Sequence, residues 1–424
     1  MQSSEIKRRD FLGASTVAGA GLALGAFESS RAATRSPNET IRVGIVGPGG
    51  RGTALMSDFF AYDDQYNARL TAVCDIWNYR RDTSALKLKN VYGSQPKVYK
   101  RLDDMLDDKD IDAVIIATAD HQHAKMLTQV VSAGKDAYCE KPMANELDDA
   151  NRALAAVNRT GRIVQFGTQR RSFPHYRSAL KVMQEGIIGK VSKVEVAWNE
   201  YSPYRWKVGD AELKACKKSD LDWQAFLMGK KDRPFDPRIY RSFRLYRDFS
   251  SGIIDQWMTH GIDAVHFLTG ESYPRSVVAH GGIYHWKDYR ENPDTMEAVL
   301  EYGEGENKFL VTYATNLVNA APGWWLKVMG THGTLECEND WRVSGDGSKR
   351  RDALKEATEI VEDPEAMHHM ANWLDAVRRQ DSSGLYAPVS AGYGHSIACI
   401  MTTDAQWSGQ RMVFDPKKRD ISAG

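Results

Sequence analysis

The sequence has few cysteines, and none of them form a recognisable pair. Five cysteines are scattered along 424 residues without a CxxC spacing. This pattern indicates neither a zinc site nor a disulfide framework, so no metal is expected. Cys74 and Cys139 lie in or beside apolar runs, and we predict that they are buried as small hydrophobic side chains.

The sequence also lacks an excess of charge of either sign. Its 56 lysines and arginines are matched by 56 aspartates and glutamates. Binding to nucleic acid or to an anionic membrane surface usually depends on a strong positive field. We therefore expect no nucleic-acid partner and no attachment to a charged membrane surface.

The apolar run near the N-terminus is too short for a membrane span. It has about 15 residues, rich in glycine and alanine, whereas a bilayer needs about 20. It follows Lys7-Arg8-Arg9-Asp10-Phe11-Leu12, an arrangement that resembles a twin-arginine export signal, and Ser30-Arg31-Ala32 fits a cleavage site. We set residues 1–34 aside and expect export by the twin-arginine route to the periplasm, without a stable membrane span.

The rest of the chain is too long for one simple core. Roughly 390 residues remain, which predicts two domains. Up to about residue 143, short apolar runs alternate with helical stretches, as in a parallel sheet built from βαβ units. A helix over 146–158 should end at Gly161. The first domain is predicted over 35–165, with strands at 41–46, 70–75, 113–118, 136–139 and 163–166.

The pattern changes in the second predicted domain, 166–424. Residues 191–198 alternate between apolar and polar side chains, and three later segments do so more loosely. Such strands suit an antiparallel sheet with one face open to water or to a partner. The C-terminal helices can pack back on the first domain. The predicted elements are strands at 191–198, 277–284, 295–302 and 308–315, helices at 369–378 and 393–407, and an extended end at 411–415.

A glycine-rich turn follows the first predicted strand. The apolar run 41–46 breaks into Gly47-x-Gly49-x-x-Gly52, and a helix is predicted to start near Thr53. Gly47 would allow a sharp turn, Gly49 would let a pyrophosphate approach the backbone, and Gly52 would let the helix pack on the strand. The helix N-terminus then offers free N–H groups to phosphates. This pattern predicts a dinucleotide site.

An acidic residue stands at the end of the second predicted strand. Asp75 lies 23 residues after Gly52, close to the spacing of about 20 expected for a carboxylate that binds ribose hydroxyls. An acid at this place favours NAD over NADP. Arg80 and Arg81 are close enough in the sequence to bind a 2′-phosphate, so NADP remains an alternative.

Five segments, taken in order, resemble one known family. They are the glycine turn, Asp75, residues 116–123, residues 133–142 with Glu-Lys-Pro at their end, and residues 252–263 with His260-Gly-Ile-Asp263. Together they resemble the glucose-fructose oxidoreductase / inositol dehydrogenase family, Gfo/Idh/MocA. The resemblance implies an α/β fold: an N-terminal Rossmann domain and a C-terminal α/β domain with a large open, mainly antiparallel sheet. It also implies an NAD(P)-dependent oxidoreductase that acts on CH–OH groups of sugars, polyols and their derivatives.

The same resemblance implies the cofactor contacts. In the family, the lysine of Glu-Lys-Pro lies between nicotinamide and substrate, so Lys141 is expected to hydrogen-bond the reacting oxygen. Such a group stabilises the hydroxyl oxygen as the C–H electrons leave. Glu140 is expected to orient the lysine or to cap the next turn. The implied cofactor-binding residues are Gly47, Gly49, Gly50, Arg51, Gly52, Asp75, Thr118, His123, Glu140 and Lys141.

The second catalytic segment departs from the family pattern. Family members commonly have Asp-x-x-x-His on one helix face, whereas here Gln256 stands four residues before His260 and Asp255 stands five before. On an α-helix a residue five positions away lies well round the cylinder, so Asp255 cannot be assumed to fill the acid's place. Both Asp255 and Gln256 therefore remain candidates for binding the substrate. We expect His260 to be a general base or acid. Since glutamine cannot take a proton, acid–base work falls to Lys141 and His260, with Asp263 bracing the histidine or the helix.

In the family, the stretch after the strand 163–166 lines the substrate side of the nicotinamide. The resemblance therefore implies that Gln169, Arg170 and Arg171 bind substrate. The two arginines either hold a sugar hydroxyl or carboxylate or pair with a surface acid. Several aromatic side chains are expected either to stack on sugar faces or to pack in the ordinary way: Trp198, Tyr201, Tyr204, Trp206 and Trp257.

Three functions remain open from the sequence. Because free nicotinamide cofactor should be scarce outside the cytoplasm, we expect a cofactor that is loaded before export and kept. The first function is oxidoreduction of a sugar, polyol or glycoside with tightly bound NAD(P). The second is a redox-neutral, NAD-dependent glycoside hydrolase on the same scaffold. The third, suggested by Gln256, is a non-catalytic sugar-binding relative. A homodimer or homotetramer through the open sheet is expected.

Overall fold

The computed structural model describes residues 36, 38–338 and 340–424. The predicted export signal lies outside these residues. All described residues belong to one compact unit, Ala33–Gly424. The described part of the chain holds no group of side chains that could bind a metal ion and no helix long and apolar enough to cross a membrane. The prediction that Cys74 and Cys139 are buried is confirmed, and the other three cysteines are buried as well.

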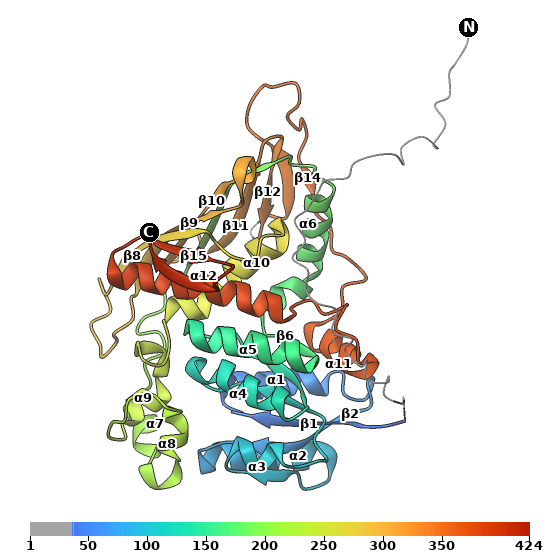
Figure 1. The fold of residues 1–424 in the computed structure, drawn as a ribbon, viewed down its shortest axis with the longest axis vertical. Coiled ribbons are helices and arrows are strands. Elements are labelled where there is room, and N and C mark those ends of the chain that lie inside the picture. The colour runs from blue at the N-terminus through green and yellow to red at the C-terminus, as the bar shows by residue number, and fades with distance from the viewer. Residues whose placement is uncertain (1–35, 37, 339) are drawn as a thin grey trace. The chain divides into compact units, whose positions relative to one another are not determined.

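A six-stranded parallel sheet forms the N-terminal part of this unit (Figure 1). The strand order is β3-β2-β1-β4-β5-β6, and every neighbouring pair is parallel. The central strands are almost fully buried apolar runs, as a sheet covered on both faces requires. The strands are β1 (Ile41–Val46), β2 (Ala68–Cys74), β3 (Lys97–Tyr99), β4 (Ala113–Ile116), β5 (Asp136–Cys139) and β6 (Val164–Phe166).

The five strands predicted for this sheet are present, with ends that differ by at most two residues. The edge strand β3 was not predicted, because it has three residues and two of them are exposed. The predicted helix before the second half is α5, and it ends at Gly161, whose φ of 63° is the left-handed conformation that favours glycine. The helices are α1 (Gly50–Phe60), α2 (Asn78–Tyr92), α3 (Leu102–Leu106), α4 (His123–Ser132) and α5 (Leu147–Thr160).

A ten-stranded sheet follows, in the order β14-β13-β12-β11-β7-β10-β9-β8-β15-β16. Only β7 and β10 pair in parallel, so the sheet is mainly antiparallel, as predicted. The short strands β11 to β14 were not predicted. The strands are β7 (Val191–Asn199), β8 (Ser276–Gly282), β9 (Thr295–Tyr302), β10 (Phe309–Asn316), β11 (Trp324–Gly330), β12 (Gly333–Cys337), β13 (Arg342–Gly345), β14 (Thr358–Glu359), β15 (Met412–Asp415) and β16 (Asp420–Ala423).

Helices cover one face of this second sheet and leave the other face bare. Buried and exposed residues alternate along β9, so its apolar face packs inward. The covering helices are α6 (Pro174–Gln184), α10 (Thr259–Thr269) and α12 (Val389–Ser408) (Figure 1). Three large apolar side chains are exposed on neighbouring strands of the bare side. We call this side the open face, and these side chains are Val278, Val299 and Leu310.

The C-terminal helices also contact the first sheet. Helix α12 packs on α5 and β6 as well as on β8, and α11 (His369–Arg379) packs on α1. Trp373 of α11 is fully buried, with its ring centroid 5.7 Å from that of Tyr138 on β5. The backbone N–H of Phe166 donates to the carbonyl oxygen of Ala387 at 2.9 Å. Residues 369–408, which form α11, α12 and the segment between them, therefore hold the two sheets together.

Candidate active site

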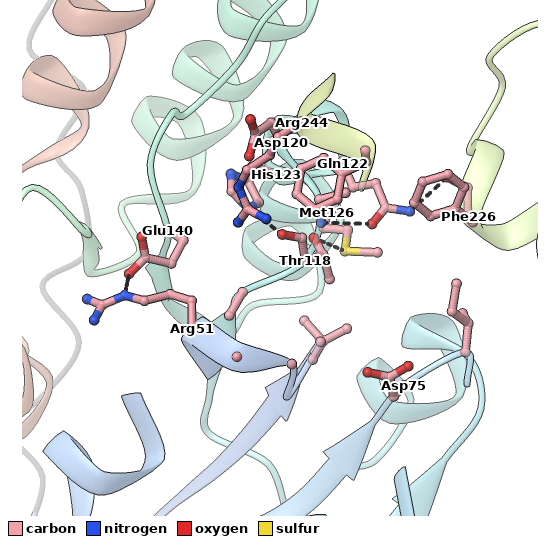
Figure 2. Close-up of a pocket in the computed structure, with 18 of the residues that line it drawn as sticks. Arg51, Asp75, Thr118, Asp120, Gln122, His123, Met126, Glu140, Phe226 and Arg244 are labelled. Carbon is pink, nitrogen blue, oxygen red and sulfur yellow. Dashed lines mark hydrogen bonds and ion pairs between the residues drawn. The ribbon is translucent and has the colours of Figure 1, made fainter. Parts of the chain in front are cut away.

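A cavity of about 840 Å³ lies at the carboxyl ends of the first sheet's strands, where parallel sheets bind ligands. Its other wall comes from β7 and from the turn that leads into α10. Figure 2 shows the first-sheet side, with Asp75 on one side of the glycine turn and Glu140 with Arg51 on the other. The predicted site residues that line the cavity are Gly47, Gly49, Gly50, Arg51, Asp75, Thr118, His123, Glu140, Lys141, Gln169, Gln256 and His260.

The four glycines of the turn divide into two kinds. Gly47 has a φ of +75°, and a Cβ there would lie 2.7 Å from Cγ2 of Thr118; a Cβ at Gly52 would lie 2.5 Å from the oxygen of Gly47. At these two positions a side chain would clash with neighbouring atoms of the protein, so glycine is required by the fold. A Cβ at Gly50 would meet nothing within 4 Å, so Gly49 and Gly50 border open space. Helix α1 starts there with no side-chain cap and no acid in its first turn, which leaves its first N–H groups for an anion.

Asp75 lies at the end of β2 and faces the cavity. Its Oδ1 accepts a hydrogen bond from the backbone N–H of Trp77 at 2.8 Å, and burial raises its pKa to about 6. Its other oxygen has no hydrogen-bond partner among the described residues. Arg81 is buried and donates to the Asp75 carbonyl oxygen at 2.8 Å and to Asn78 at 2.5 Å, so it stabilises the loop between β2 and α2. Arg80 is the arginine of the pair that lines the cavity.

Glu140 connects the glycine turn to the predicted catalytic lysine. Its Oε1 accepts from Nε of Arg51 at 2.7 Å, and its Oε2 accepts from the backbone N–H of Lys141 at 3.2 Å. A Cβ at Gly167 would lie 2.6 Å from the Glu140 carboxylate, so glycine is needed to make room for it. His123 fixes the neighbouring loop, since its Nδ1 lies 2.8 Å from the carbonyl oxygen of Pro142.

Lys141 is held by main-chain carbonyl groups. Its Nζ donates to the carbonyl oxygens of Gln256 at 2.9 Å and Asp255 at 3.2 Å, and to Oε1 of Gln256 at 3.3 Å. Burial lowers the pKa of Lys141 from its ordinary value of 10.5, while the charges of Asp120 and Glu140 oppose that shift. The amine is therefore closer to its neutral form than a lysine in water.

A π-helical turn, η5 (Ile254–Met258), leads into α10. Such turns often occur at functional sites. Gln256, four residues before His260, lines the cavity with it, while the Oδ2 of Asp255 accepts from the backbone N–H of Ser251 at 2.6 Å and the side chain is buried. The Asp255 side chain does not line the cavity, and its carbonyl oxygen accepts from Lys141.

Gln256 is the centre of a polar network. Its Oε1 accepts from Nε of Arg244 at 2.9 Å as well as from Lys141, and its Nε2 donates to Oδ2 of Asp120 at 2.6 Å. Ser250 donates to the same oxygen of Asp120 at 2.6 Å. The amide thus presents its oxygen to two cations and its nitrogen to a carboxylate. Figure 2 places Asp120 and Arg244 at the same end of the cavity.

His260 lines the cavity as a neutral imidazole. Burial, with the nearby charges of Lys141 and Arg170, holds its pKa well below 6.5. Its Nδ1 is buried and has no hydrogen-bond partner in the described part of the chain. A neutral imidazole offers one donor and one acceptor, so His260 can orient a hydroxyl.

Asp263 has Arg171 and His395 as partners, so its contacts fit the bracing of the helix, one of the two roles expected for it. Its Oδ2 accepts from Nε of Arg171 at 2.7 Å, and its Oδ1 lies 3.6 Å from Nδ1 of His395. Burial acts to raise the pKa of the Asp263 carboxyl, but the charge of Arg171 and the nearby His395 hold it well below its usual range. The backbone N–H of Met143 donates to Nε2 of His395 at 3.2 Å, so this group supports the loop that carries the lysine. Arg171 does not line the cavity, and its ion pair with Asp263 fits the alternative that it pairs with an acid.

Tryptophans form the wall beside His260. Trp198 and Trp257 stack with ring centroids 5.3 Å apart and 7° between their planes, and Trp206 lies 6.0 Å from Trp257. The guanidinium of Arg170 lies 4.8 Å from the Trp198 ring and pairs with Glu338 at 3.1 Å. Arg170 therefore supports this wall from behind instead of reaching into the cavity as expected. The three tryptophans line the cavity, whereas Tyr201 and Tyr204 are exposed and lie outside its lining.

An insertion from the second half covers the other end of the cavity. It carries α7 (Asp210–Ala215), α8 (Trp223–Leu227) and α9 (Pro237–Arg241), drawn beside α3 and α4 in Figure 1. We call residues 210–249 the clasp. The Phe226 carbonyl oxygen accepts from Nε2 of Gln122 at 2.9 Å (Figure 2). Phe226 also packs in an apolar cluster that contains Trp77. The clasp thus closes over the loops that would bind the dinucleotide.

Sequence reasoning missed Asp120, Arg244 and the clasp. Asp120 lies inside the segment 116–123 that carries the family resemblance, but the sequence alone indicates no role for it. Arg244 and the clasp lie in a stretch that matches no motif. Their roles emerge only where the chain brings them against the first sheet.

The residues present fit a nicotinamide dinucleotide. The open glycine turn and the free N–H groups of α1 suit a pyrophosphate, and Asp75 can accept from ribose hydroxyls. Lys141 and His260 line the same cavity. A parallel sheet with this arrangement defines the class of dinucleotide-binding oxidoreductases.

Family models assign the chain within this class. Residues 41–168 match the oxidoreductase family with the NAD-binding Rossmann fold, and residues 227–336 match the GFO/IDH/MocA C-terminal domain. The chain belongs to the Gfo/Idh/MocA family of oxidoreductases, and NAD is the type of cofactor its Rossmann domain binds. The predicted fold class and family are confirmed.

Individual relatives agree with this assignment. Inositol 2-dehydrogenase of Rhizobium meliloti (strain 1021) is 26% identical over 320 residues, which cover 73% of this chain and 81% of the relative. Myo-inositol 2-dehydrogenase of Thermotoga maritima is 25% identical over 38% of this chain and 46% of its own length. Several further relatives are likewise matched over less than half of their length.

Solved structures show the same fold. The WlbA dehydrogenase from Bordetella pertussis, in complex with NADH and UDP-GlcNAcA, has a TM-score of 0.64 at 18% identity and covers 89% of this chain and 99% of that one. Levoglucosan dehydrogenase in complex with NADH has a TM-score of 0.64 at 16% identity and covers 88% of this chain and 98% of that one.

Proposed function

We propose that the protein oxidises a CH–OH group of a sugar, polyol or glycoside, with NAD held in the cavity. The observation that carries this proposal is the position of Lys141. The lysine is half-buried in the cavity that the glycine turn and the tryptophan wall line, and its pKa is lowered by desolvation. The relatives named as inositol dehydrogenases support a polyol or sugar as substrate.

Lys141 is the group that takes the hydroxyl proton. In its neutral form the amine has a lone pair for this proton, and the carbonyl oxygens of Asp255 and Gln256 keep its remaining hydrogens directed. Its longest contact, 3.3 Å to Gln256 Oε1, is the one that a substrate oxygen can most easily replace. His260 orients the same hydroxyl as a neutral donor or acceptor.

Bound NAD would supply a hydride acceptor for the carbon that loses its C–H electrons. Trp198, Trp206 and Trp257 offer faces on which the apolar side of a sugar ring can stack, which excludes water from the reacting carbon. Proton removal at Lys141 and orientation at His260 are then the tasks of the chain itself.

The clasp supports a cofactor that remains bound through turnover. This agrees with the expected export by the twin-arginine route, where a protein folds around its cofactor before it reaches the periplasm. A retained cofactor must return to its oxidised form within the site. A second sugar can accept the hydride, or the hydride can return to the same substrate in the redox-neutral hydrolysis of a glycoside. Net formation of a ketosugar would indicate the first route, and release of an aglycone without net redox change would indicate the second.

Lys141→Ala tests the proposal. Turnover of sugars, polyols or glycosides should fall about 10²–10⁴-fold, as for loss of a general base. The content of bound nucleotide should stay as in the unmodified protein. Lys109→Ala, on an exposed lysine outside the site, is the matched control. Equal turnover in Lys141→Ala and Lys109→Ala would contradict the proposal.

We also propose that copies of the chain associate through the open face as a dimer or tetramer. Three large apolar side chains are exposed there on neighbouring strands, and soluble monomers rarely leave such a patch bare. Light scattering of the purified protein tests this, and a monomer at micromolar concentration would contradict it.

A further inference from the structure

Arg244 is an unusual arginine for its position. Its side chain lines the cavity, its Nε donates to Gln256 Oε1 at 2.9 Å, and its guanidinium lies 4.4 Å from the ring of Phe243. In the described part of the chain, no carboxylate lies within the 4.0 Å of an ion pair with it. Its two terminal Nη nitrogens have no hydrogen-bond partner there.

Three other arginines with shielded side chains have carboxylate partners, and the buried Arg81, which has none, donates its terminal nitrogens to the Asp75 carbonyl oxygen and to Asn78. Arg171 pairs with Asp263 at 2.7 Å, Arg170 with Glu338 at 3.1 Å, and Arg290 with Asp288 at 2.9 Å. A buried charge without a counter-charge is costly, because it loses hydration that nothing replaces. Arg244 is therefore the position where this chain keeps an uncompensated cation at a cavity wall.

The nearest acid does not supply the missing partner. Asp120 acts on Arg244 through its charge, but its Oδ2 already accepts from Ser250 and from the Gln256 amide. The side chain of Gln256 accepts from Arg244 and donates to Asp120, so it bridges the two charges. This leaves the planar Nη pair of Arg244 for a ligand.

The neighbouring side chains place this cation at the sugar end of the cavity. Arg244 and Lys141 both donate to the same oxygen of Gln256, at 2.9 and 3.3 Å, so one sugar ring can reach both. Arg205 adds positive potential, with its guanidinium 5.4 Å from the ring of Trp257 and an ion pair to Glu200 at 2.8 Å. An acidic substituent on the ring would meet Arg244 while a ring hydroxyl meets Lys141.

We propose that the substrate is a sugar acid, such as a hexuronic acid or its glycoside, and that Arg244 binds its carboxylate through both Nη nitrogens. The guanidinium fork matches a carboxylate in a bidentate pair. The carboxylate does not react; it fixes which ring carbon lies over Lys141. The buried carboxyl groups of Asp120 and Asp255 favour a singly charged substituent over a doubly charged phosphate. This inference rests on the proposed function and narrows its substrate class.

The test compares sugars that differ only at C6. Glucose with glucuronate, galactose with galacturonate and mannose with mannuronate, each also as the methyl glycoside, are assayed for kcat/KM and for binding to the holoenzyme. The acid of at least one pair should be preferred about 100-fold, the effect of a charged hydrogen-bonded pair. Arg244→Gln should bring this ratio close to one, and Arg244→Lys should keep part of it. Arg159→Gln, on an exposed arginine of α5, should keep the full ratio.

The possible failures are distinguishable. Oxidation of neutral sugars as efficient as that of their acids would overturn the sugar-acid inference and leave the proposed function standing. The same holds if Arg244→Gln lowers kcat/KM equally for both members of a pair, because the arginine would then only position Gln256. Absence of oxidation with every sugar and glycoside would contradict the proposed function itself.

Discussion

At the scale of single residues, the acceptors around Lys141 determine its chemistry. A lysine held by a carboxylate would be kept charged, but here two carbonyl oxygens and one amide oxygen receive its hydrogens. Carbonyl dipoles only partly offset the loss of hydration, so burial lowers the pKa. A base that must lose its proton near neutral pH benefits from such surroundings.

The pH dependence of turnover should report this pKa. The value of kcat/KM should rise with pH as Lys141 becomes neutral, with a midpoint below 10.5. Because the negative charge of Asp120 raises the pKa of Lys141, Asp120→Asn should shift the midpoint to lower pH. A pH profile of the two proteins, with Asp64→Asn at an exposed site as control, measures this shift. A midpoint that stays in place or moves upward would contradict the role of Lys141 as the base.

Sequence reasoning at this scale worked where function requires a fixed residue type. A turn against a pyrophosphate needs glycine, so Gly47 and Gly52 could be predicted from spacing alone, and the structure gives each a steric reason. Arg244 could not be predicted, because its significance is the lack of a partner. That depends on which acids the fold brings near it, and no local pattern records this.

At the scale of elements, the segment before His260 decides which residue faces the cavity. The sequence left this role open between Asp255 and Gln256. Gln256, four residues before His260, lines the cavity with it, while the Asp255 carboxylate accepts from the Ser251 N–H outside the lining. Burial and the nearby charge of Asp120 raise the pKa of Asp255 above its usual range. The pair that faces the cavity is therefore glutamine–histidine, and the segment Ile254–Met258 is a π turn, not the α-helix that the spacing argument assumed.

The clasp is the element that should control cofactor release. Trp223 is buried in the clasp and does not line the cavity, and it stacks on Phe226 with ring centroids 5.2 Å apart. Trp223→Ala should remove about 3–5 kcal/mol of packing and let the clasp open. We expect nucleotide to dissociate at least tenfold faster, with turnover per bound nucleotide preserved. The control is Trp341→Ala, at a partly buried tryptophan outside the clasp that stacks on His175.

Nucleotide release measured by fluorescence after dilution distinguishes the two variants, and a melting curve confirms that each is folded. Equal rates of nucleotide dissociation from Trp223→Ala and from the unmodified protein would show that the clasp does not retain the cofactor.

The clasp itself could not be predicted, since its helices are short and are stabilised by contact with Trp77 and Ala119, which lie in loops after strands of the first sheet. Local sequence carries little signal for such elements.

The predicted strands follow the same logic. Buried central strands such as β1 and β4 have strong apolar runs and were placed within two residues. Strands β12 to β14 were missed because they have only five, four and two residues, and β11 was missed because only two of its seven residues, Leu326 and Val328, are buried. These strands are defined mainly by pairing with their neighbours, which is a property of the sheet.

At the scale of the whole described unit, the site exists only where its two sheets meet. The first sheet supplies the glycine turn, Asp75 and Lys141, while the second half supplies Gln256 and His260. Helix α12 packs on elements of both sheets and so fixes the distance between these groups. Substrate binding and cofactor binding are therefore parts of one rigid arrangement.

The most direct measurement is mass spectrometry of the small molecules released when protein purified without added nucleotide is denatured. The account predicts NAD or NADH in nearly one-to-one ratio with the chain, because the glycine turn, Asp75 and the clasp together enclose a dinucleotide. A protein that releases no nucleotide and does not bind added NAD would contradict the central claim that this cavity is a nicotinamide cofactor site.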